Sequence, residues 1–328
     1  MARKLRLEFK GAVYHVINRG NYRSALFRDD GAKLAFLDCL GEACEKAGWE
    51  VHAWCVMSNH FHLALETPRG NLVAGMQWLQ STFALRFNRY RRECGHLFQG
   101  RYKSLLVDPA DALGPLCHYI HLNPVRAGIT TVERLGDWPW SSFRWLMRPK
   151  ERATWFRPMA SLEHAGGLAD TPAGRQKYAE YLAWLAENAP EQKRLRFDRM
   201  SKGWVLGPRE FKAELVEEHR EAFAALEQGE PDLEEARMAR LEARLGELLA
   251  AIGKTRADLA RDPKSAAWKV AVVTEMKAST TATNRWLADA LAMGSPFQVS
   301  RLASACRAEP GAAAPWLRAS ISGGMRQK

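Results

Sequence analysis

The chain has 328 residues, of which 47% are hydrophobic, and a formal net charge of +11. This apolar fraction excludes a wholly disordered chain, and the length predicts about two domains. There is neither an apolar run of about 20 residues, which a membrane span would need, nor a signal-peptide core after the basic N-terminus. We therefore expect a cytoplasmic protein with no membrane partner.

Charge is distributed unevenly along the chain. Residues 1–150 carry a net charge of +8, residues 213–247 carry −7, and residues 248–328 carry +7. Two basic blocks around an acidic one suggest two units that face nucleic acid, joined by a solvated connector. The predicted organisation is a first domain at 1–150, a helical extension at 151–212, an acidic helical connector at 213–249 and a helical domain at 250–328.

Hydrophobic periodicity predicts the order of elements in the first domain. Strands are expected at residues 13–17, 51–56, 60–67 and 102–107. One helix follows the acidic pair 29–30 and ends at Gly48, and a second follows Asn71. A short third helix is expected over residues 110–122, ended by Pro124. The first six elements have the split βαβ, or ferredoxin-like, order of an α+β fold: one antiparallel sheet with two helices on one face.

The segment His60-Phe61-His62 is the sharpest local signal. Residues two apart on a strand point to the same face, roughly 7 Å from each other. If Phe61 and Leu63 face the two helices, His60 and His62 face the open side of the sheet. There they could hold a divalent metal together with phosphate oxygens, and replacing either should leave the fold intact. The alternative is a pair of exposed histidines with no function, because His-x-His is common by chance.

The third predicted helix carries a candidate nucleophile. Tyr119 and Asn123 lie about one turn apart on one helix face, so both can point toward the histidine pair. A phenolate can attack a phosphodiester and retain the product as a covalent intermediate. An ordinary packing role for Tyr119 is the alternative. Spacing alone does not exclude the rival nucleophiles Tyr14, Tyr90 and Tyr102.

Four segments of the first domain carry a recognisable set of motifs. They are residues 14–21 (YHVINRGN), 57–63 (MSNHFHL), 95–102 (GHLFQGRY) and 119–128 (YIHLNPVRAG). In this order the motifs resemble those of the single-tyrosine HUH transposases, and most of all their REP-associated tyrosine transposase branch. The resemblance spans residues 9–145, and residues 203–211 also resemble an extension of longer members.

The resemblance implies a reaction. His60 and His62 would hold a divalent metal, Mg²⁺ or Mn²⁺, while Tyr119 attacks single-stranded DNA. The products would be a 5′-phosphotyrosine and a free 3′-hydroxyl, which can reverse the reaction on another strand. Asn123 stands where the family often has a longer glutamine ligand, which makes it a candidate third ligand. The branch is associated with short palindromic hairpins, so hairpin or single-stranded DNA is the expected partner. A homodimer is an open alternative to a monomer.

Two further groups of residues are candidates for DNA contacts. Arg86, Arg89 and Arg92 of the second predicted helix would bind phosphates. Helices at 284–291 and 296–305, with a turn between them, form a candidate helix-turn-helix. Its groove-facing residues would be Gln298, Ser300 and Arg301. An ordinary helical hairpin is the alternative.

Three functions therefore compete. The resemblance favours DNA cleavage and strand transfer. A non-cutting DNA-binding protein or regulator of the same fold would bind DNA without reacting with it. A His-x-His metallohydrolase of small molecules would need further histidines and aspartates at later strand ends and a longer parallel αβ pattern, which the sequence lacks.

Overall fold

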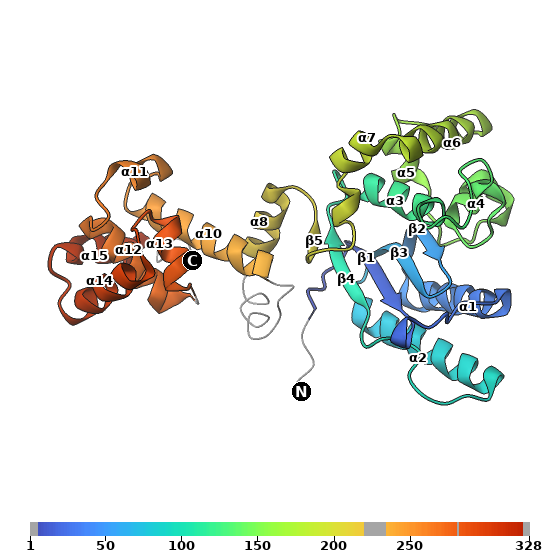
Figure 1. Ribbon diagram of the computed structural model, residues 1–328, viewed down its shortest axis with the longest axis horizontal. Coiled ribbons are helices and arrows are strands. Elements are labelled where there is room, and N and C mark those ends of the chain that lie inside the picture. The colour runs from blue at the N-terminus through green and yellow to red at the C-terminus, as the bar shows by residue number, and fades with distance from the viewer. Residues whose placement is uncertain (1–5, 220–233, 281, 324–328) are drawn as a thin grey trace. The chain divides into compact units, whose positions relative to one another are not determined.

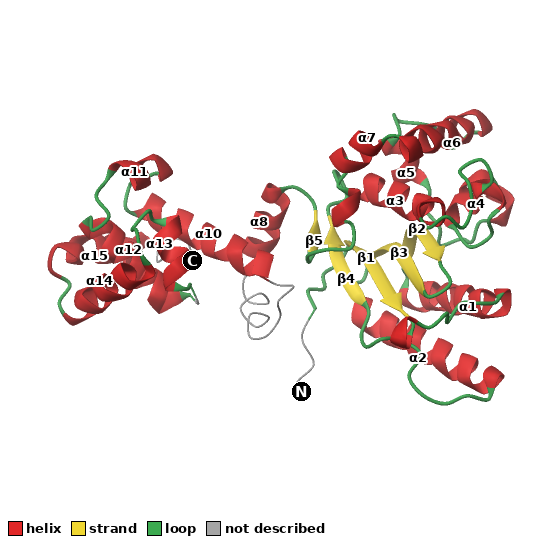
Figure 2. Cartoon of the chain, viewed as in Figure 1, coloured by secondary structure: helices red, strands yellow, loops and turns green. Residues whose placement is uncertain are grey.

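A computed structural model describes residues 6–219, 234–280 and 282–323 (Figures 1 and 2). Contacts divide these residues into a first unit, which extends to Lys212, and a second unit, which begins at Ala213. Within the described ranges, no helix is both long enough and apolar enough to cross a membrane.

The first unit is built on a five-stranded sheet with the strand order β2-β3-β1-β4-β5 (Figure 2). The strands are β1 (Ala12–Arg19), β2 (Glu50–Val56), β3 (His60–Thr67), β4 (Lys103–Val107) and β5 (Val205–Leu206). The first four pair antiparallel in the ferredoxin-like order, which confirms the predicted α+β fold. β5 pairs parallel to β4. The sequence does not predict this strand, because two residues are too few to show a periodic pattern.

Helices α1 (Asp30–Ala47) and α2 (Leu72–Arg91) cover one face of this sheet (Figure 1). α1 begins where the Asp29 side chain accepts a hydrogen bond from the Ala32 amide, and it ends at Gly48, whose φ is 70°. Phe61 of β3 packs against Phe36 of α1, with 4.6 Å between the ring centroids. The prediction that Phe61 faces the two helices is confirmed.

The opposite face of the sheet is covered by helices that follow β4 (Figure 1). Three of them contact the strands: α3 (Leu113–Arg126), α4 (Ser142–Met147) and α5 (Met159–His164). α6 (Pro172–Glu187) packs on these three helices, and α7 (Ala189–Arg194) packs on α6. Leu116 of α3, Leu162 of α5 and Tyr178 of α6 share one core with Val13 and Ala64 of the sheet. The prediction that this face is open is therefore wrong, because α3, α4 and, from the extension, α5 close over it.

α3 continues through Pro124 and ends at Arg126, whereas the sequence predicts an end before the proline. Proline lacks the N–H that would bond to the carbonyl of Ile120, but its φ is compatible with a helix. The last turn is held by hydrogen bonds from the Ala127 amide to the Asn123 carbonyl (3.0 Å) and from the Ile129 amide to the Pro124 carbonyl (2.9 Å). Arg126 is thereby placed on the helix, two turns after the candidate nucleophile.

After β5 comes α8 (Arg209–Glu218), and the rest of the second unit is helical. Its helices are α10 (Glu234–Ala251), α11 (Arg256–Arg261), α12 (Ala267–Ser279), α13 (Asn284–Ala290), α14 (Pro296–Ala308) and α15 (Ala314–Gly323). Leu241 and Leu245 of α10 are buried in the core of this unit. The expected connector at 213–249 is thus partly a core element, while its residues 220–233 lie outside the described residues.

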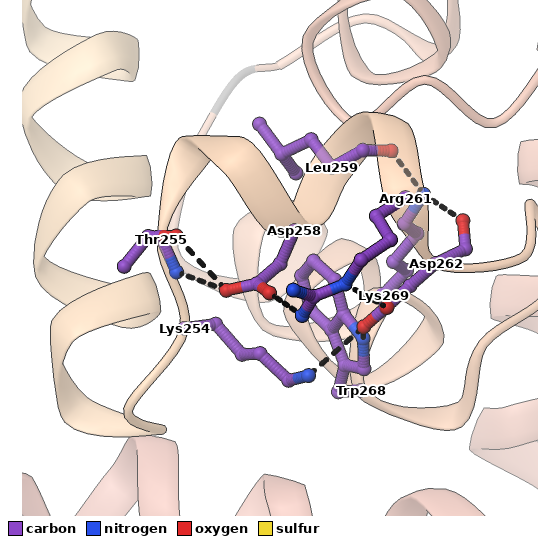
Figure 3. A network of polar contacts seen from close by, with 8 residues as sticks. All are labelled: Lys254, Thr255, Asp258, Leu259, Arg261, Asp262, Trp268 and Lys269. Carbon is purple, nitrogen blue, oxygen red and sulfur yellow. Dashed lines mark hydrogen bonds and ion pairs between the residues drawn. The ribbon is translucent and has the colours of Figure 1, made fainter.

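A polar network joins α11 to α12 in the second unit (Figure 3). Thr255 and Asp258 form a capping box at the start of α11. Asp262 accepts a hydrogen bond from the indole N–H of Trp268 at 2.9 Å. Lys269 is fully buried, and its ammonium group donates to two main-chain carbonyl oxygens at 2.7 and 3.0 Å. These bonds satisfy a buried charge that would otherwise be very unfavourable in this core.

Candidate active site

The two histidines of β3 lie on the sheet face that α3 covers. In the antiparallel register of β1 and β3, Arg19 is opposite His60 and Ile17 is opposite His62. His62 has 4% of its surface exposed, whereas His60 is half-buried. The expectation that both side chains sit on an open surface is therefore wrong for His62, and its replacement will affect the core.

α3 brings Tyr119 against this pair of histidines. The Tyr119 ring contacts the His62 ring edge-on, with 5.8 Å between the centroids. Phe197 packs edge-on against the same ring at 5.5 Å. The Tyr119 hydroxyl lies 3.4 Å from Oγ of Ser201. The structure thus brings the predicted nucleophile against His62, whose ring lies 5.0 Å from that of His60.

The rival tyrosines lie elsewhere. Tyr14 and Tyr102 are buried, and burial raises the pKa of both phenols, that of Tyr102 to about 12. The Tyr14 hydroxyl donates to the carbonyl of Leu7 at 2.9 Å. Tyr90 is 83% exposed near the C-terminal end of α2. Among the residues described, Tyr119 alone of the four has a ring contact with His62.

His15 of β1 completes the histidine cluster, although the sequence pattern does not single it out. Its Nδ1 lies 2.7 Å from the main-chain oxygen of Met200, and its Nε2 lies 2.9 Å from Nδ1 of His62. His15 pairs with Ala64 in the register of β1 and β3, which places it diagonally beside His62. Only the alternation of β1 could have suggested its orientation, and its partners depend on strand pairing.

Both β3 histidines present a lone pair at Nε2. Asn59 Oδ1 lies 2.6 Å from Nδ1 of His60, so His60 donates from Nδ1. His62 donates from Nδ1 to His15, whose own proton is held on Nδ1 by the Met200 carbonyl. Burial lowers the pKa of His15 and of His60 to about 4 and holds that of His62 well below its ordinary value, so the rings are neutral at neutral pH. Neutral imidazole nitrogens of this kind are metal ligands.

Asn123 is the third predicted metal ligand. It lies one turn after Tyr119 on α3, and its amide nitrogen is buried without a hydrogen-bond partner. No group of three or more His, Cys, Asp or Glu residues is placed to hold a metal within the described ranges. Two imidazoles and an amide oxygen, with phosphate oxygens in the remaining positions, nevertheless suit a divalent cation such as Mn²⁺ or Mg²⁺. The residues present therefore fit a metal site that is completed by substrate.

Two arginines add positive charge beside this cluster. The Arg126 guanidinium lies over the Tyr119 ring, 4.8 Å from its centroid, and Arg19 is exposed opposite His60. Neither has an ion pair with a carboxylate in the described parts of the chain, and both lower the pKa of His62, after burial. Cations without carboxylate partners beside a candidate nucleophile suit a phosphate ligand. The sequence prediction misses Arg126 because it ends the helix at Pro124.

The three arginines predicted to bind phosphate lie on or just after α2, whose residues pack on the sheet face opposite Tyr119. Arg86 forms two hydrogen bonds with the carboxylate of Glu42 from α1, at 2.6 and 3.0 Å. Arg89 and Arg92 are exposed. The structure therefore does not bring these arginines together with the histidine pair.

In the second unit, α13 and α14 occupy the positions predicted for a pair of helices, and α14 extends three residues further than expected, to Ala308. Ser295 caps α14 by accepting a hydrogen bond from the Gln298 amide at 3.2 Å. Gln298 and Ser300 are half-buried and Arg301 is exposed, whereas Val299 is buried in the core. Of the predicted groove-facing residues, Arg301 is thus free of the core, while Gln298 and Ser300 border it.

Known proteins resemble mainly the first unit. Residues 8–123 match the family model described as "Transposase IS200 like". A REP-associated tyrosine transposase of Haemophilus influenzae is 31% identical over 120 residues, which cover 33% of this chain and 66% of that protein. A REP-associated tyrosine transposase of Escherichia coli is 25% identical over 168 residues, 51% of this chain and 92% of that protein. A solved structure of a REP-associated tyrosine transposase bound to a REP hairpin aligns at 19% identity with a TM-score of 0.38, over 48% of this chain and 92% of its own.

Proposed function

The domain at residues 8–123 belongs to the IS200-like transposase family, and on that basis we propose that this protein cuts and rejoins single-stranded DNA with Tyr119 as its nucleophile. The observation that carries the proposal is the contact between the Tyr119 ring and His62. This contact sets a phenol beside the imidazole of His62, which in turn contacts the imidazole of His60, and the Nε2 lone pairs of both histidines are available to a cation. The relatives are named for REP sequences, so we propose DNA beside a REP-like hairpin as the substrate, met in the cytoplasm.

The reaction consists of two phosphoryl transfers. In the first, Oη of Tyr119 attacks the scissile phosphorus, the bond from phosphorus to the 3′-oxygen breaks, and the phenol proton is released. The 3′-oxygen takes up a proton and leaves as a hydroxyl, while the 5′-phosphate remains on Tyr119. In the second, a 3′-hydroxyl attacks this phosphotyrosine, which restores the phenol and a phosphodiester. The number of phosphodiester bonds is conserved, so no external energy source is needed.

The surrounding residues have separate parts in this reaction. Phe197 and Arg126 pack against the Tyr119 ring and limit its rotation, and Ser201 lies beside its hydroxyl. Arg126 and Arg19 would hold the phosphate by charge. A divalent cation held by His60, His62 and Asn123 would polarise the scissile phosphate and stabilise the charge that develops on it.

DNA contacts beyond the site are proposed for two helices. The exposed Arg89 and Arg92 at the end of α2, with Arg86 nearby, would contact phosphates of a hairpin stem. In the second unit, Gln298, Ser300 and Arg301 of α14 would read a duplex groove as part of a helix-turn-helix. These contacts would select the hairpin, while Tyr119 acts on the unpaired strand beside it.

Adduct formation tests the proposal. The purified protein is incubated with Mn²⁺ and a labelled single strand that carries a hairpin from beside its own gene, and the products are separated under denaturing conditions. We expect a covalent adduct whose peptide map places the nucleotide on Tyr119. Tyr119→Phe keeps the ring and its packing, so it should bind the DNA but form no adduct. Tyr90→Phe, which changes an exposed tyrosine, is the matched control and should react normally.

The same experiment separates the competing functions. DNA binding by the wild-type protein without any adduct would favour a non-cutting regulator. An adduct on Tyr102, or normal cleavage by Tyr119→Phe, would show that another residue is the nucleophile. Equal cleavage of perfect duplex would contradict the proposed single-stranded substrate.

A further inference from the structure

One buried titratable residue of the site, His15, has no part in the reaction proposed above. Its side chain is fully buried in β1, and both of its ring nitrogens are hydrogen-bonded. Nδ1 lies 2.7 Å from the Met200 carbonyl oxygen, and Nε2 lies 2.9 Å from Nδ1 of His62. The His15 and His62 rings also stack, with 5.1 Å between centroids. Two hydrogen bonds on a buried ring fix both its rotation and its tautomer.

We infer that His15 is a positioning residue that keeps His62 in the tautomer a metal ligand needs, an inference that rests on the proposed function. A neutral imidazole carries one proton and has one lone pair to offer. The Met200 carbonyl can only accept, so the His15 proton stays on Nδ1 and His15 Nε2 can only accept. The His62 proton is therefore held on Nδ1, and the lone pair on His62 Nε2 remains available to a cation.

The same bonds explain why another residue at position 15 would not suffice. Without an acceptor there, the Nδ1–H of His62 would be buried and unsatisfied, which is unfavourable. If the His62 proton moves from Nδ1 to Nε2, the unsatisfied N–H is removed, but the lone pair on Nε2 that a cation needs is lost as well. His15 thus acts on the cation only through the choice of tautomer at His62.

The anchor of this arrangement lies outside residues 8–123, which match the transposase family model. Met200 follows α7, whereas the family match ends at residue 123. The same short segment supplies Phe197 and Ser201, which contact Tyr119. Residues 197–201 therefore constrain the candidate metal ligand and the candidate nucleophile together, and the extension is a working part of the site.

Two variants separate positioning from packing. His15→Gln keeps an acceptor for the Nδ1–H of His62, while His15→Leu fills similar space without one. Long-range ¹H–¹⁵N spectra of the metal-free protein should place the His62 proton on Nδ1 in the wild type and in His15→Gln, and on Nε2 in His15→Leu. Mn²⁺ affinity, measured by calorimetry without DNA, should fall by about 10- to 100-fold in His15→Leu and by under about threefold in His15→Gln.

The outcomes distinguish this inference from the function on which it rests. If the wild-type spectrum places the His62 proton on Nε2, the inference is overturned, whether or not the variants fold. It is also overturned if His15→Leu binds Mn²⁺ as tightly as the wild type while His62→Ala does not, and the proposed function then stands. If His62→Ala binds Mn²⁺ like the wild type, the proposed metal site is itself wrong and the role of His15 fails with it.

Discussion

His60 and His62 are two residues apart on one strand, yet their surroundings differ sharply. His60 is half-buried and donates to the side chain of its neighbour Asn59. His62 is buried between His15 and Tyr119 and is part of the packing of the sheet against α3. The two residues can share one chemical role and still differ in what they contribute to stability.

We expect unequal effects of replacing them. His62→Ala leaves a cavity and deprives His15 Nε2 of its donor, which should lower the free energy of unfolding by about 3 kcal/mol. His60→Ala should lower it by less than about 1 kcal/mol, because His60 is only half-buried. Both should abolish Mn²⁺ binding and adduct formation. Urea unfolding of the full chain, followed through hydrogen exchange of β3 amides, measures the difference, and equal losses would contradict the assigned burial.

Arg126 and Arg89 form a second informative pair, on opposite faces of the sheet. Arg126→Ala should weaken binding of an unstructured single strand and reduce the slope of log affinity against log salt by about one, because one phosphate contact is lost. Arg89→Ala should leave that binding unchanged and weaken binding only when a hairpin stem is present. Salt titrations with both DNA forms check this. An equal effect of Arg89→Ala on the unstructured strand would place the strand on the α2 side.

Among the elements, α3 shows how a local rule is overridden by its surroundings. Pro124 is buried in this helix, and the chain continues to Arg126 because the following amides find carbonyl partners. Tyr119, Asn123 and Arg126 thereby share one helix, packed against β2 and β3. The candidate site lies between α3 and the sheet, so its geometry depends on the packing of regular secondary structure.

α14 carries the residues that are proposed to contact duplex DNA. Arg301→Ala should weaken binding of duplex or hairpin DNA by about 1–3 kcal/mol if Arg301 contacts a base, and by less if it contacts only phosphate. Arg307→Ala changes the same residue type on the same helix, two turns nearer its C-terminus, and should have little effect because groove contacts come from the N-terminal half. Fluorescence anisotropy with a labelled hairpin compares them. Equal losses would indicate a non-specific basic surface in place of a reading helix.

At the scale of the whole molecule, the first and second units bury different kinds of side chain. The first contains Tyr178 hydrogen-bonded to His118 and to His121, both at 2.9 Å, and all three side chains are fully buried. In the described part of the second unit no histidine is buried, and His219 is half-buried. The two units should therefore respond differently to acid.

The first unit should lose stability in mild acid before the second. Burial lowers the pKa of His121 to about 3 and that of His118 well below its ordinary value, so both stay neutral in the folded state. In the unfolded chain both histidines become protonated below about pH 6.5, which favours unfolding. This loss of stability is absent above pH 7 and grows as the pH falls. For His121 alone it reaches about 2 kcal/mol at pH 5. Urea unfolding at pH 7.5 and pH 5, resolved by hydrogen exchange in each unit, measures it, and a parallel loss in both units would contradict this origin.

The sequence alone determined the order of elements and the residue types of the site. Period-two and helical patterns predict the four antiparallel strands and both helices of the ferredoxin-like arrangement, because each element must bury one apolar face. The His-x-His spacing and the motif around Tyr119 identify the candidate chemistry, since both lie within single elements whose geometry is local. Sequence spacing also predicts two helices at 284–291 and 296–305, which the structure has at Asn284–Ala290 and Pro296–Ala308.

Only the tertiary structure decided which residues surround that chemistry. His15 meets His62 through the register of β1 and β3, and Met200 and Phe197 reach the site from more than 70 residues beyond Tyr119. Such contacts depend on long-range packing, which leaves no periodic signal in the sequence. The covering of one sheet face was missed for the same reason. The buried residues of 151–212 are spread over several helices, and only the tertiary structure shows that they share one core with β1 and β3.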